Sequence, residues 1–288
     1  MTRLSLYESV AQQTASVVIR RYSTSFGLAS KLLEPSVRRH VENIYALVRV
    51  ADEIVDGVAV EAGLDTVAVA RALNEFERDT HLAIANGFSA NLVIQAFAIT
   101  ARETSFGEEL TEPFFASMRM DLSETEHDQD SFDRYVYGSA EVVGLMCLRA
   151  FLKDIELTDA DRSRFDRGAC ALGAAFQKVN FLRDLAADFD SLGRSYFPGI
   201  SVESFTEADK LRLVDDIDLD LRTAAAVIPD LPAGSRRAVV LAHDLFADLG
   251  RRLRATPAAE LRTTRVRVPN PVKLRIATAA ALGRKPRT

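Results

Sequence analysis

Apolar residues recur every three to four positions through most of the chain, the spacing that buries one face of an α-helix. Glycine and proline separate these segments. No alternating strand pattern, internal repeat or low-complexity linker interrupts them. The pattern predicts a single all-α domain over residues 1–288, with helices near 6–21, 36–56, 65–86, 90–104, 112–122, 131–153, 159–190, 206–228, 234–254 and 270–282.

The second of these helices carries acidic side chains beside its apolar stripe. On a helical wheel, Asp52 lies within about 40° of Val41, Tyr45, Val48 and Asp56. A carboxylate that faces a protein core is unfavourable unless it is paired or binds a metal. Two aspartates four residues apart usually belong to a solvated helix face, but the apolar setting here favours an internal role.

A later helix repeats this arrangement. Asn180, Asp184 and Asp188 follow one another at intervals of four and lie within about 80° on one face. An arginine accompanies each set of acids, Arg49 in the first helix and Arg183 in the second. Two separate helices are therefore predicted to present oxygen donors toward the interior.

The chemistry of these donors is specific. Carboxylate and amide oxygens without histidine or cysteine suit Mg²⁺, or Mn²⁺, rather than Zn²⁺. Mg²⁺ takes few protein oxygens and completes its coordination with water and phosphate, so two such sets facing a cavity can hold ions around a diphosphate. Arginine matches phosphate geometry, and bound metal stabilises a diphosphate leaving group. An apolar cavity beside it would shield a carbocation from water.

Charge is distributed unevenly along the chain. There are 36 Lys+Arg and 41 Asp+Glu, for a net charge of −5. The basic C-terminal segment, residues 251–288, holds eleven basic residues and one acid, Glu260, so the first 250 residues carry −15. This asymmetry is compatible with a solvated helix, an anionic membrane surface or an anionic small substrate. Nucleic acid is not expected as a partner, because the acidic body repels phosphate and the segment lacks interleaved aromatic residues.

Histidine and cysteine usage excludes a disulfide framework and a zinc site of paired cysteines. The two cysteines, Cys147 and Cys170, are expected to be small core residues. There is neither an apolar signal segment nor a run long enough to span a membrane. We therefore expect a cytoplasmic protein with peripheral contact at the inner face of the membrane. Four histidines without ligand spacing are expected at the surface or at helix caps: His40, His81, His127 and His243.

Several short segments, spread over nearly the whole chain, share features with one enzyme family. They are Tyr22-Ser-Thr-Ser-Phe26, Tyr45-Ala-Leu-Val-Arg-Val-Ala-Asp-Glu-Ile-Val-Asp-Gly57, Met118-Arg-Met-Asp-Leu122, Tyr135-Val-Tyr-Gly-Ser-Ala-Glu-Val-Val-Gly144, Ala175-Phe-Gln-Lys-Val-Asn-Phe-Leu-Arg-Asp-Leu-Ala-Ala-Asp188, Gly193-Arg-Ser-Tyr-Phe-Pro198 and Arg265-Val-Arg-Val268. In these segments the chain resembles the squalene/phytoene synthase family of head-to-head prenyl synthases. The second aspartate segment, with the Gly-Arg-x-Tyr-x-Pro that follows it, is highly specific.

The resemblance implies a fold, a reaction and a set of site residues. The fold is the isoprenoid-synthase helical bundle around a central cavity, and the reaction joins two allylic prenyl diphosphates through a cyclopropyl intermediate. By this resemblance the catalytic aspartates are Asp52, Asp56, Asp184 and Asp188. Mg²⁺ would be bound by Asp52, Asp56, Asn180 and Asp184, and the prenyl diphosphates by Tyr22, Ser23, Thr24, Ser25, Tyr45, Arg49, Gln177 and Arg183.

Four positions depart from the family pattern. The first motif has Glu53 where a second aspartate is usual, although its first and last acids are kept. Glu141 replaces a usual glycine, which would alter the cavity wall, and Phe246 stands where many members have tyrosine. Leu192 replaces a usual arginine before the Gly-Arg pair.

Within the family, the chain is most similar to the bacterial phytoene synthases. This similarity predicts condensation of two geranylgeranyl diphosphates to phytoene, with loss of a proton and no NADPH. Squalene or dehydrosqualene synthesis from farnesyl diphosphate is the alternative. A non-catalytic assembly or binding relative is the alternative of another class, and it is disfavoured because both aspartate motifs are intact.

Overall fold

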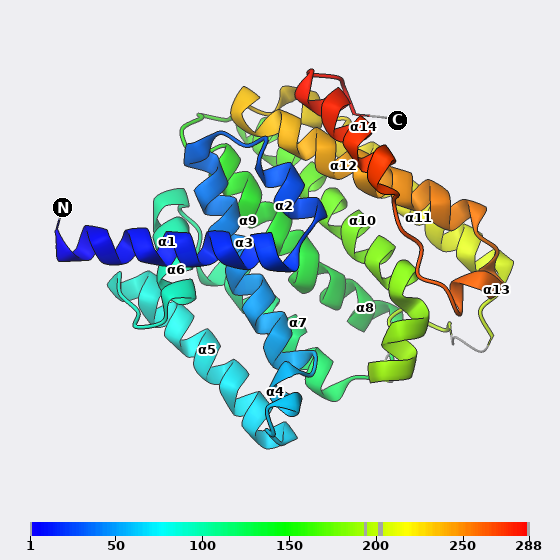
Figure 1. The fold of residues 1–288 in the computed structure, drawn as a ribbon, viewed down its shortest axis with the longest axis horizontal. Coiled ribbons are helices and arrows are strands. Elements are labelled where there is room, and N and C mark those ends of the chain that lie inside the picture. The colour runs from blue at the N-terminus through cyan, green and yellow to red at the C-terminus, as the bar shows by residue number, and fades with distance from the viewer. Residues whose placement is uncertain (1, 193–194, 201–203, 287–288) are drawn as a thin grey trace.

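The computed structural model describes residues 2–192, 195–200 and 204–286, and the side chains of all of these except 186–192. Its regular elements are helices (Figure 1). Their bounds are α1 Arg3–Tyr22, α2 Ser25–Ser30, α3 Pro35–Val55, α4 Val58–Glu61, α5 Thr66–Asn86, α6 Leu92–Thr104, α7 Glu108–Ser123, α8 Gln129–Val136, a π-helical turn η1 Tyr137–Glu141, α9 Val142–Phe151, α10 Asp159–Leu192, α11 Glu207–Ala225, a 3₁₀ turn η2 Ile228–Asp230, α12 Ala233–Ala255, α13 Ala258–Leu261 and α14 Asn270–Ala281.

The all-α prediction is confirmed. Each of the ten expected helices is present, and local chemistry accounts for several of their starts: Asp65 caps α5 by accepting a hydrogen bond from the Ala68 amide, and Pro35 begins α3. The expected segment 131–153 is divided into α8, the π turn and α9. Among the described residues, extended structure is limited to an isolated bridge between Glu126 and Ser195.

The helices occupy three regions in Figure 1. Helices α1 and α3–α6 lie at the left and below, α7–α10 run through the centre, and α11–α14 lie at the right and upper right. Helix α1 crosses in front of α3 and contacts it, and α14 lies along α12. No helix within the described part of the chain is long and apolar enough to cross a membrane.

Two groups of buried apolar side chains form the core. The first joins α1, α3, α5, α6, α7 and α9, and includes Leu47 and Val55 of α3. The second joins α8, α10, α11 and α12, and includes Leu182 and Leu185 of α10. The buried residues beside the two sets of acids, Val55 on α3 and Leu182 and Leu185 on α10, thus belong to different groups.

The π turn brings three elements into close contact. A Cβ atom on Gly138 would lie 2.2 Å from the carbonyl oxygen of Pro113 in α7, so only glycine fits there. The turn also inserts one residue into the helical register, which changes the direction in which the side chains before and after it point. The turn therefore positions Ser139 and Glu141 toward α10, as described below.

The expectation for the histidines is wrong in three cases. His40, His127 and His243 are buried, with exposed fractions of 3%, 7% and 0%. Each is satisfied by neighbouring polar atoms; His243, for example, is within 3.0 Å of the Asp244 carboxylate and 3.2 Å of the Leu221 carbonyl. The spacing of histidines in the sequence does not reveal these hydrogen-bond partners, because they are other residue types on the same turn or on another helix.

Candidate active site

The first set of acids lies at the C-terminal end of α3. Gly57 has a φ of 111°, a left-handed conformation that ends the helix and leaves Asp56 as its C-cap. Asp52, one turn earlier, is partly covered, whereas Asp56 is exposed. The predicted inward placement is therefore correct for Asp52. Asp56 is exposed to solvent because the helix ends at this residue.

Asp52 has an unfavourable electrostatic environment for a charged carboxylate. Its pKa is raised well above the usual value, first by burial and next by the Asp56 carboxylate. Arg49 acts in the opposite direction, and Asp121 adds a further raising effect. Carboxylates that gather without an equal number of cations require positive charge from elsewhere.

Asp121, on α7, is a site residue that the sequence interpretation did not single out. It is buried and accepts hydrogen bonds from the hydroxyls of Tyr135, at 2.8 Å, and Tyr196, at 3.2 Å. Both tyrosine rings contact the ring of Phe181 on α10, with centroids 5.8 and 4.1 Å apart. This chain of contacts connects the Asp52 end of α3 with α10, one turn before Asp184.

The second set of acids is held by two arginines. The Asp184 carboxylate pairs with Arg183 and with Arg265, whose Nε lies 2.6 Å from Oδ1. Arg265 comes from the loop between α13 and α14, so the C-terminal part of the chain returns over this site. Asn180 is half-buried one turn before Asp184. The Asp188 side chain, which was also predicted to belong to this set, lies outside the described residues.

Arg49 lies on α3 one turn before Asp52. Its guanidinium lies over the ring of Tyr22, 4.7 Å from the centroid, and pairs with Glu53. The Arg49 Nε is buried and has no hydrogen-bond partner within the described structure. The unusual glutamate of the first motif therefore holds this arginine, whose remaining donor is free for an anion.

An aromatic cluster forms a second connection between α3 and α10. Phe26 of α2 contacts Tyr45 of α3 at 6.4 Å and Phe176 of α10 at 5.6 Å, measured between ring centroids. Phe246 of α12 stacks on Phe176 at 3.9 Å. Tyr45 lies seven residues before Asp52, and Phe176 lies eight residues before Asp184. On each helix, the aromatic contact is therefore about two turns before the acid.

The other predicted binding residues lie around this cluster. Ser23 hydrogen-bonds to Tyr45, while Tyr22 and Thr24 are exposed and Ser25 is half-buried. Gln177 Nε2 donates to the Ser139 hydroxyl of the π turn at 3.2 Å. The structure thus brings the 22–26 segment, Tyr45 and Arg49 together. Gln177 follows Phe176 of the cluster along α10, and its own side chain contacts the π turn.

Three of the family departures can be located. Glu141 is half-buried, hydrogen-bonds to Cys170, and has a pKa raised mainly by burial. Phe246 is buried in the aromatic cluster, where its ring has no hydroxyl to offer. Glu53 pairs with Arg49 as described. The fourth, Leu192, has its side chain outside the described residues.

The oxygen donors fit a divalent metal of the magnesium type. Among the described side chains, no three histidine, cysteine or acidic groups come together as a ready-made metal cage. Mg²⁺ does not need one, because it commonly binds one or two carboxylates and takes its remaining ligands from water and phosphate. Asp52, Asp56 and Asp184, with the unpartnered donor of Arg49, are suited to a metal-bound anion.

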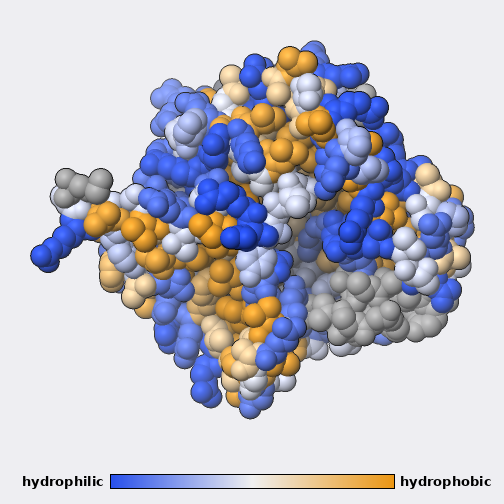
Figure 2. Space-filling model, in the orientation of Figure 1, coloured by the Kyte–Doolittle hydropathy of each residue, from blue (hydrophilic) through white to orange (hydrophobic). Residues whose placement is uncertain are grey.

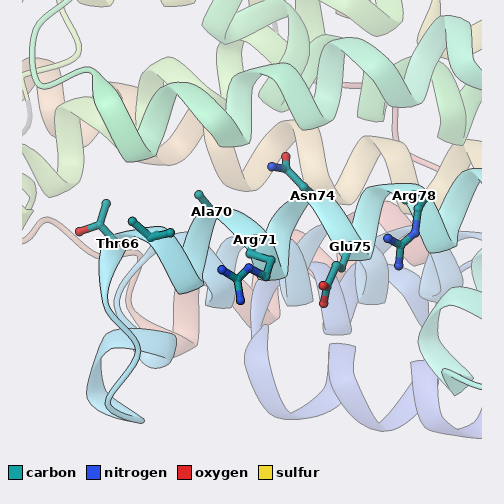
Figure 3. A pocket seen from close by; sticks show the side chains of 7 residues that line it. Thr66, Ala70, Arg71, Asn74, Glu75 and Arg78 are labelled. Atoms are coloured by element: carbon teal, nitrogen blue, oxygen red, sulfur yellow. The ribbon is translucent and has the colours of Figure 1, made fainter.

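The surface hollows found elsewhere are separate from these residues. One, of about 700 Å³, is an open depression along α5 lined by side chains between residues 66 and 78. Figure 3 shows that these side chains follow one helix and include none of the acids described above. The predicted central cavity of the bundle stays a prediction.

Comparison with known proteins agrees with this arrangement. The family model described as squalene/phytoene synthase matches residues 19–271. A 15-cis-phytoene synthase from Paracoccus sp. is 28% identical over 258 residues, covering 84% of this chain and 81% of the relative. A phytoene synthase from Arthrospira platensis is 31% identical over 73% of this chain and 67% of its own length. The crystal structure of a dehydrosqualene synthase superposes with a TM-score of 0.75 at 20% identity, covering 95% of this chain and 96% of that one.

Proposed function

The chain belongs to the squalene/phytoene synthase family, and we propose that it condenses two geranylgeranyl diphosphates to phytoene with release of diphosphate. The reaction would be Mg²⁺-dependent, would pass through a cyclopropyl (prephytoene) diphosphate, and would belong to carotenoid biosynthesis in the cytoplasm. The phytoene synthases among its relatives support this choice of substrate.

One observation carries the proposal. Asp52 of α3 has a pKa raised by burial and by nearby acids that include Asp121 of α7, and aromatic contacts connect Asp121 to Phe181 of α10, one turn before Asp184. A region of excess negative charge between two halves of an apolar core is suited to bind cations together with an anionic group on a hydrocarbon chain.

Asp52, Asp56, Asn180, Asp184 and Asp188 are the residues that would hold the metal. When bound, Mg²⁺ supplies positive charge that stabilises the departing diphosphate. The sequence motif alone puts Asp188 in this set.

The chain's own cations would complete the binding of the diphosphates. Arg49 has a buried donor without a partner, and Arg183 and Arg265 already lie on Asp184. Guanidinium groups bind phosphate oxygens with two parallel hydrogen bonds, so they would fix the orientation of the leaving group. The Tyr22, Ser23, Thr24, Ser25 segment, Tyr45 and Gln177 would position the same substrates.

The aromatic cluster would serve the hydrocarbon part of the reaction. The rings of Phe26, Phe176 and Phe246 offer apolar faces that exclude water and stabilise a nearby carbocation. Because the final cation would be quenched by loss of a proton, no hydride donor is needed and NADPH is not expected.

The test is a product assay with purified protein. Geranylgeranyl diphosphate with Mg²⁺ should give a forty-carbon hydrocarbon at the same rate with and without NADPH, and EDTA should stop the reaction. Farnesyl diphosphate should react more slowly, because its shorter chain leaves apolar contacts unmade, at about 0.8 kcal/mol per methylene. Mass spectrometry identifies the products. A thirty-carbon product formed faster from farnesyl diphosphate would replace this proposal with squalene or dehydrosqualene synthesis.

A further inference from the structure

Helix α14 exposes an apolar ridge on the side that faces away from the protein. Its inner face is buried through Ile276 and Ala280, with exposed fractions of 0% and 1%. On the opposite side, Leu274 is 69% exposed and Leu282 is 82% exposed. Two leucines two helical turns apart, both directed to solvent, form a surface that the rest of the chain does not cover.

The ridge borders a shallow depression of about 500 Å³. Its lining residues are Pro271, Leu274, Arg275, Thr278, Ala279 and Leu282, and its surface is mainly apolar. Apolar atoms are visible among charged ones in the upper part of the space-filling view, where α14 runs in Figure 1 (Figure 2). The helix thus carries apolar side chains on its outward side as well as on its buried side.

The segment that contains the ridge carries charge of one sign. Residues 261–286 contain seven lysines and arginines and no acid. Arg275, Arg284 and Lys285 are exposed on the helix or immediately after it. A second copy of this chain docking through the same face would bring two such basic surfaces together, which is unfavourable. An anionic surface with an apolar interior complements both features.

We propose that the outward face of α14 docks on anionic lipid membranes, with Leu274 and Leu282 inserted at the level of the headgroups. Basic residues near an anionic bilayer add attraction that decreases with ionic strength. The loop that precedes α14 carries Arg265, which pairs with Asp184. Docking through α14 would therefore keep the C-terminal loop of the candidate site close to the lipid.

Vesicle co-sedimentation of the full chain tests the proposal. We expect binding to phosphatidylcholine vesicles that contain 30% phosphatidylglycerol, with at least tenfold weaker partitioning for the double variant Leu274→Ser/Leu282→Ser. The matched control is Leu211→Ser/Leu219→Ser, which removes two exposed leucines from α11 and should change binding less than twofold. Raising the salt concentration from 50 to 500 mM should weaken binding of the unaltered protein at least tenfold.

Other results would overturn the proposal. Equal binding to purely neutral vesicles, or binding unaffected by salt, would remove the anionic lipid as the partner. No binding, or an equal loss in the control variant, would remove α14 as the docking surface. A concentration-dependent dimer that the Leu274→Ser/Leu282→Ser variant abolishes, measured by light scattering, would assign the ridge to a second copy. Because the readout is binding, failure of the proposed synthase activity would leave the result unaffected.

Discussion

Acidic side chains at two faces of α10 and at the end of α3 differ in the charged partners that surround them. On the face toward α11, Lys178 Nζ lies 2.5 Å from Asp216 and 2.8 Å from Asp220. On another face, Asp184 is paired with Arg183 and Arg265. At the C-terminal end of α3, Asp52 has a pKa raised well above its usual value. The acids at both faces of α10 have cationic partners within the chain, whereas Asp52 lies among more acids than Arg49 offsets.

This difference separates a structural ion pair from a ligand-binding site. Lys178 is largely covered and both of its acidic partners come from one adjacent helix, so its contacts join α10 to α11. The acids Asp52 and Asp121 come from two helices, and the charge of Asp121 adds to the effects that raise the pKa of Asp52. Such an arrangement is stable only if burial is incomplete or if a cation arrives with a ligand.

The largest effect is expected on turnover when an acid of the candidate site is neutralised. Asp52→Asn should reduce kcat/KM with geranylgeranyl diphosphate at least about 10²–10³-fold, because the charge that holds the metal is lost. Its melting temperature in EDTA should be unchanged or higher, since a repelling buried charge is removed. Steady-state kinetics and thermal unfolding measure the two effects.

Asp184→Asn provides the companion variant from the other helix. It should lose activity to a similar degree, although its stability should fall slightly because Arg183 and Arg265 lose their partner. Activity within a few-fold of the unaltered protein in both variants would contradict the metal-binding role of these acids.

A stability effect is expected from the opposite face of α10. Lys178→Met should lower the free energy of unfolding by about 1–3 kcal/mol, because it leaves Asp220 partly buried without its cation. The activity of the folded variant should change less than about threefold. Urea denaturation and kinetics distinguish the two effects, and a selective loss of activity without loss of stability would place Lys178 in the catalytic machinery instead.

Much of the fold could be predicted from the sequence because periodicity reports burial directly. Helix α3, expected at 36–56, spans Pro35–Val55, and its end is set by Gly57. Helix α2 was not predicted, because six residues are too few to show a helical period. The π turn was missed as well, since its extra residue depends on the close approach of Gly138 to α7.

The site was only partly predictable. Asp52 and Asp184 stand out because each is part of an i, i+4 pattern on an apolar face. Asp121, Tyr196 and Arg265 have no such pattern, although each lies within a segment that carried the family resemblance. Their role depends on contacts across 75 positions of sequence, between Asp121 and Tyr196, and 81 positions, between Asp184 and Arg265. Such contacts leave no local periodic signal.

A buried titratable group of another kind, His40, lies at the opposite end of α3 from Asp52. Buried His40 lies 3.1 Å from the Thr100 hydroxyl, and burial, followed by the charge of Arg39, lowers its pKa from 6.5 to about 4. The unfolded chain therefore binds a proton more readily than the folded chain between these values. Stability should fall by up to about 3 kcal/mol as the pH decreases from 6.5 toward 4.

Substituting His40→Gln should flatten this part of the pH profile. The amide can still bond to Thr100 but cannot be protonated, so the variant and the unaltered protein should differ in slope between pH 6.5 and 4. Urea unfolding at several pH values measures the slope. Parallel profiles would mean that the pKa of His40 is the same in the folded and the unfolded chain.

The smallest effect is expected at Glu141, the carboxylate that replaces the usual glycine. Its side chain hydrogen-bonds to Cys170 of α10, and burial raises its pKa. Glu141→Gly should lower the free energy of unfolding by about 1 kcal/mol, because glycine destabilises a helix, partly offset by removal of a buried carboxyl. Since the contact is with Cys170 and not with Gln177, the rate should stay the same within about twofold, and the product should keep its length.

Glu141→Gln, which keeps the side-chain length, separates loss of charge from loss of volume. A change in product length in the glycine variant but not in the glutamine variant would instead make Glu141 part of the wall that contacts the hydrocarbon chain. Glu141 would then belong to the candidate site and not only to the contacts that stabilise the fold.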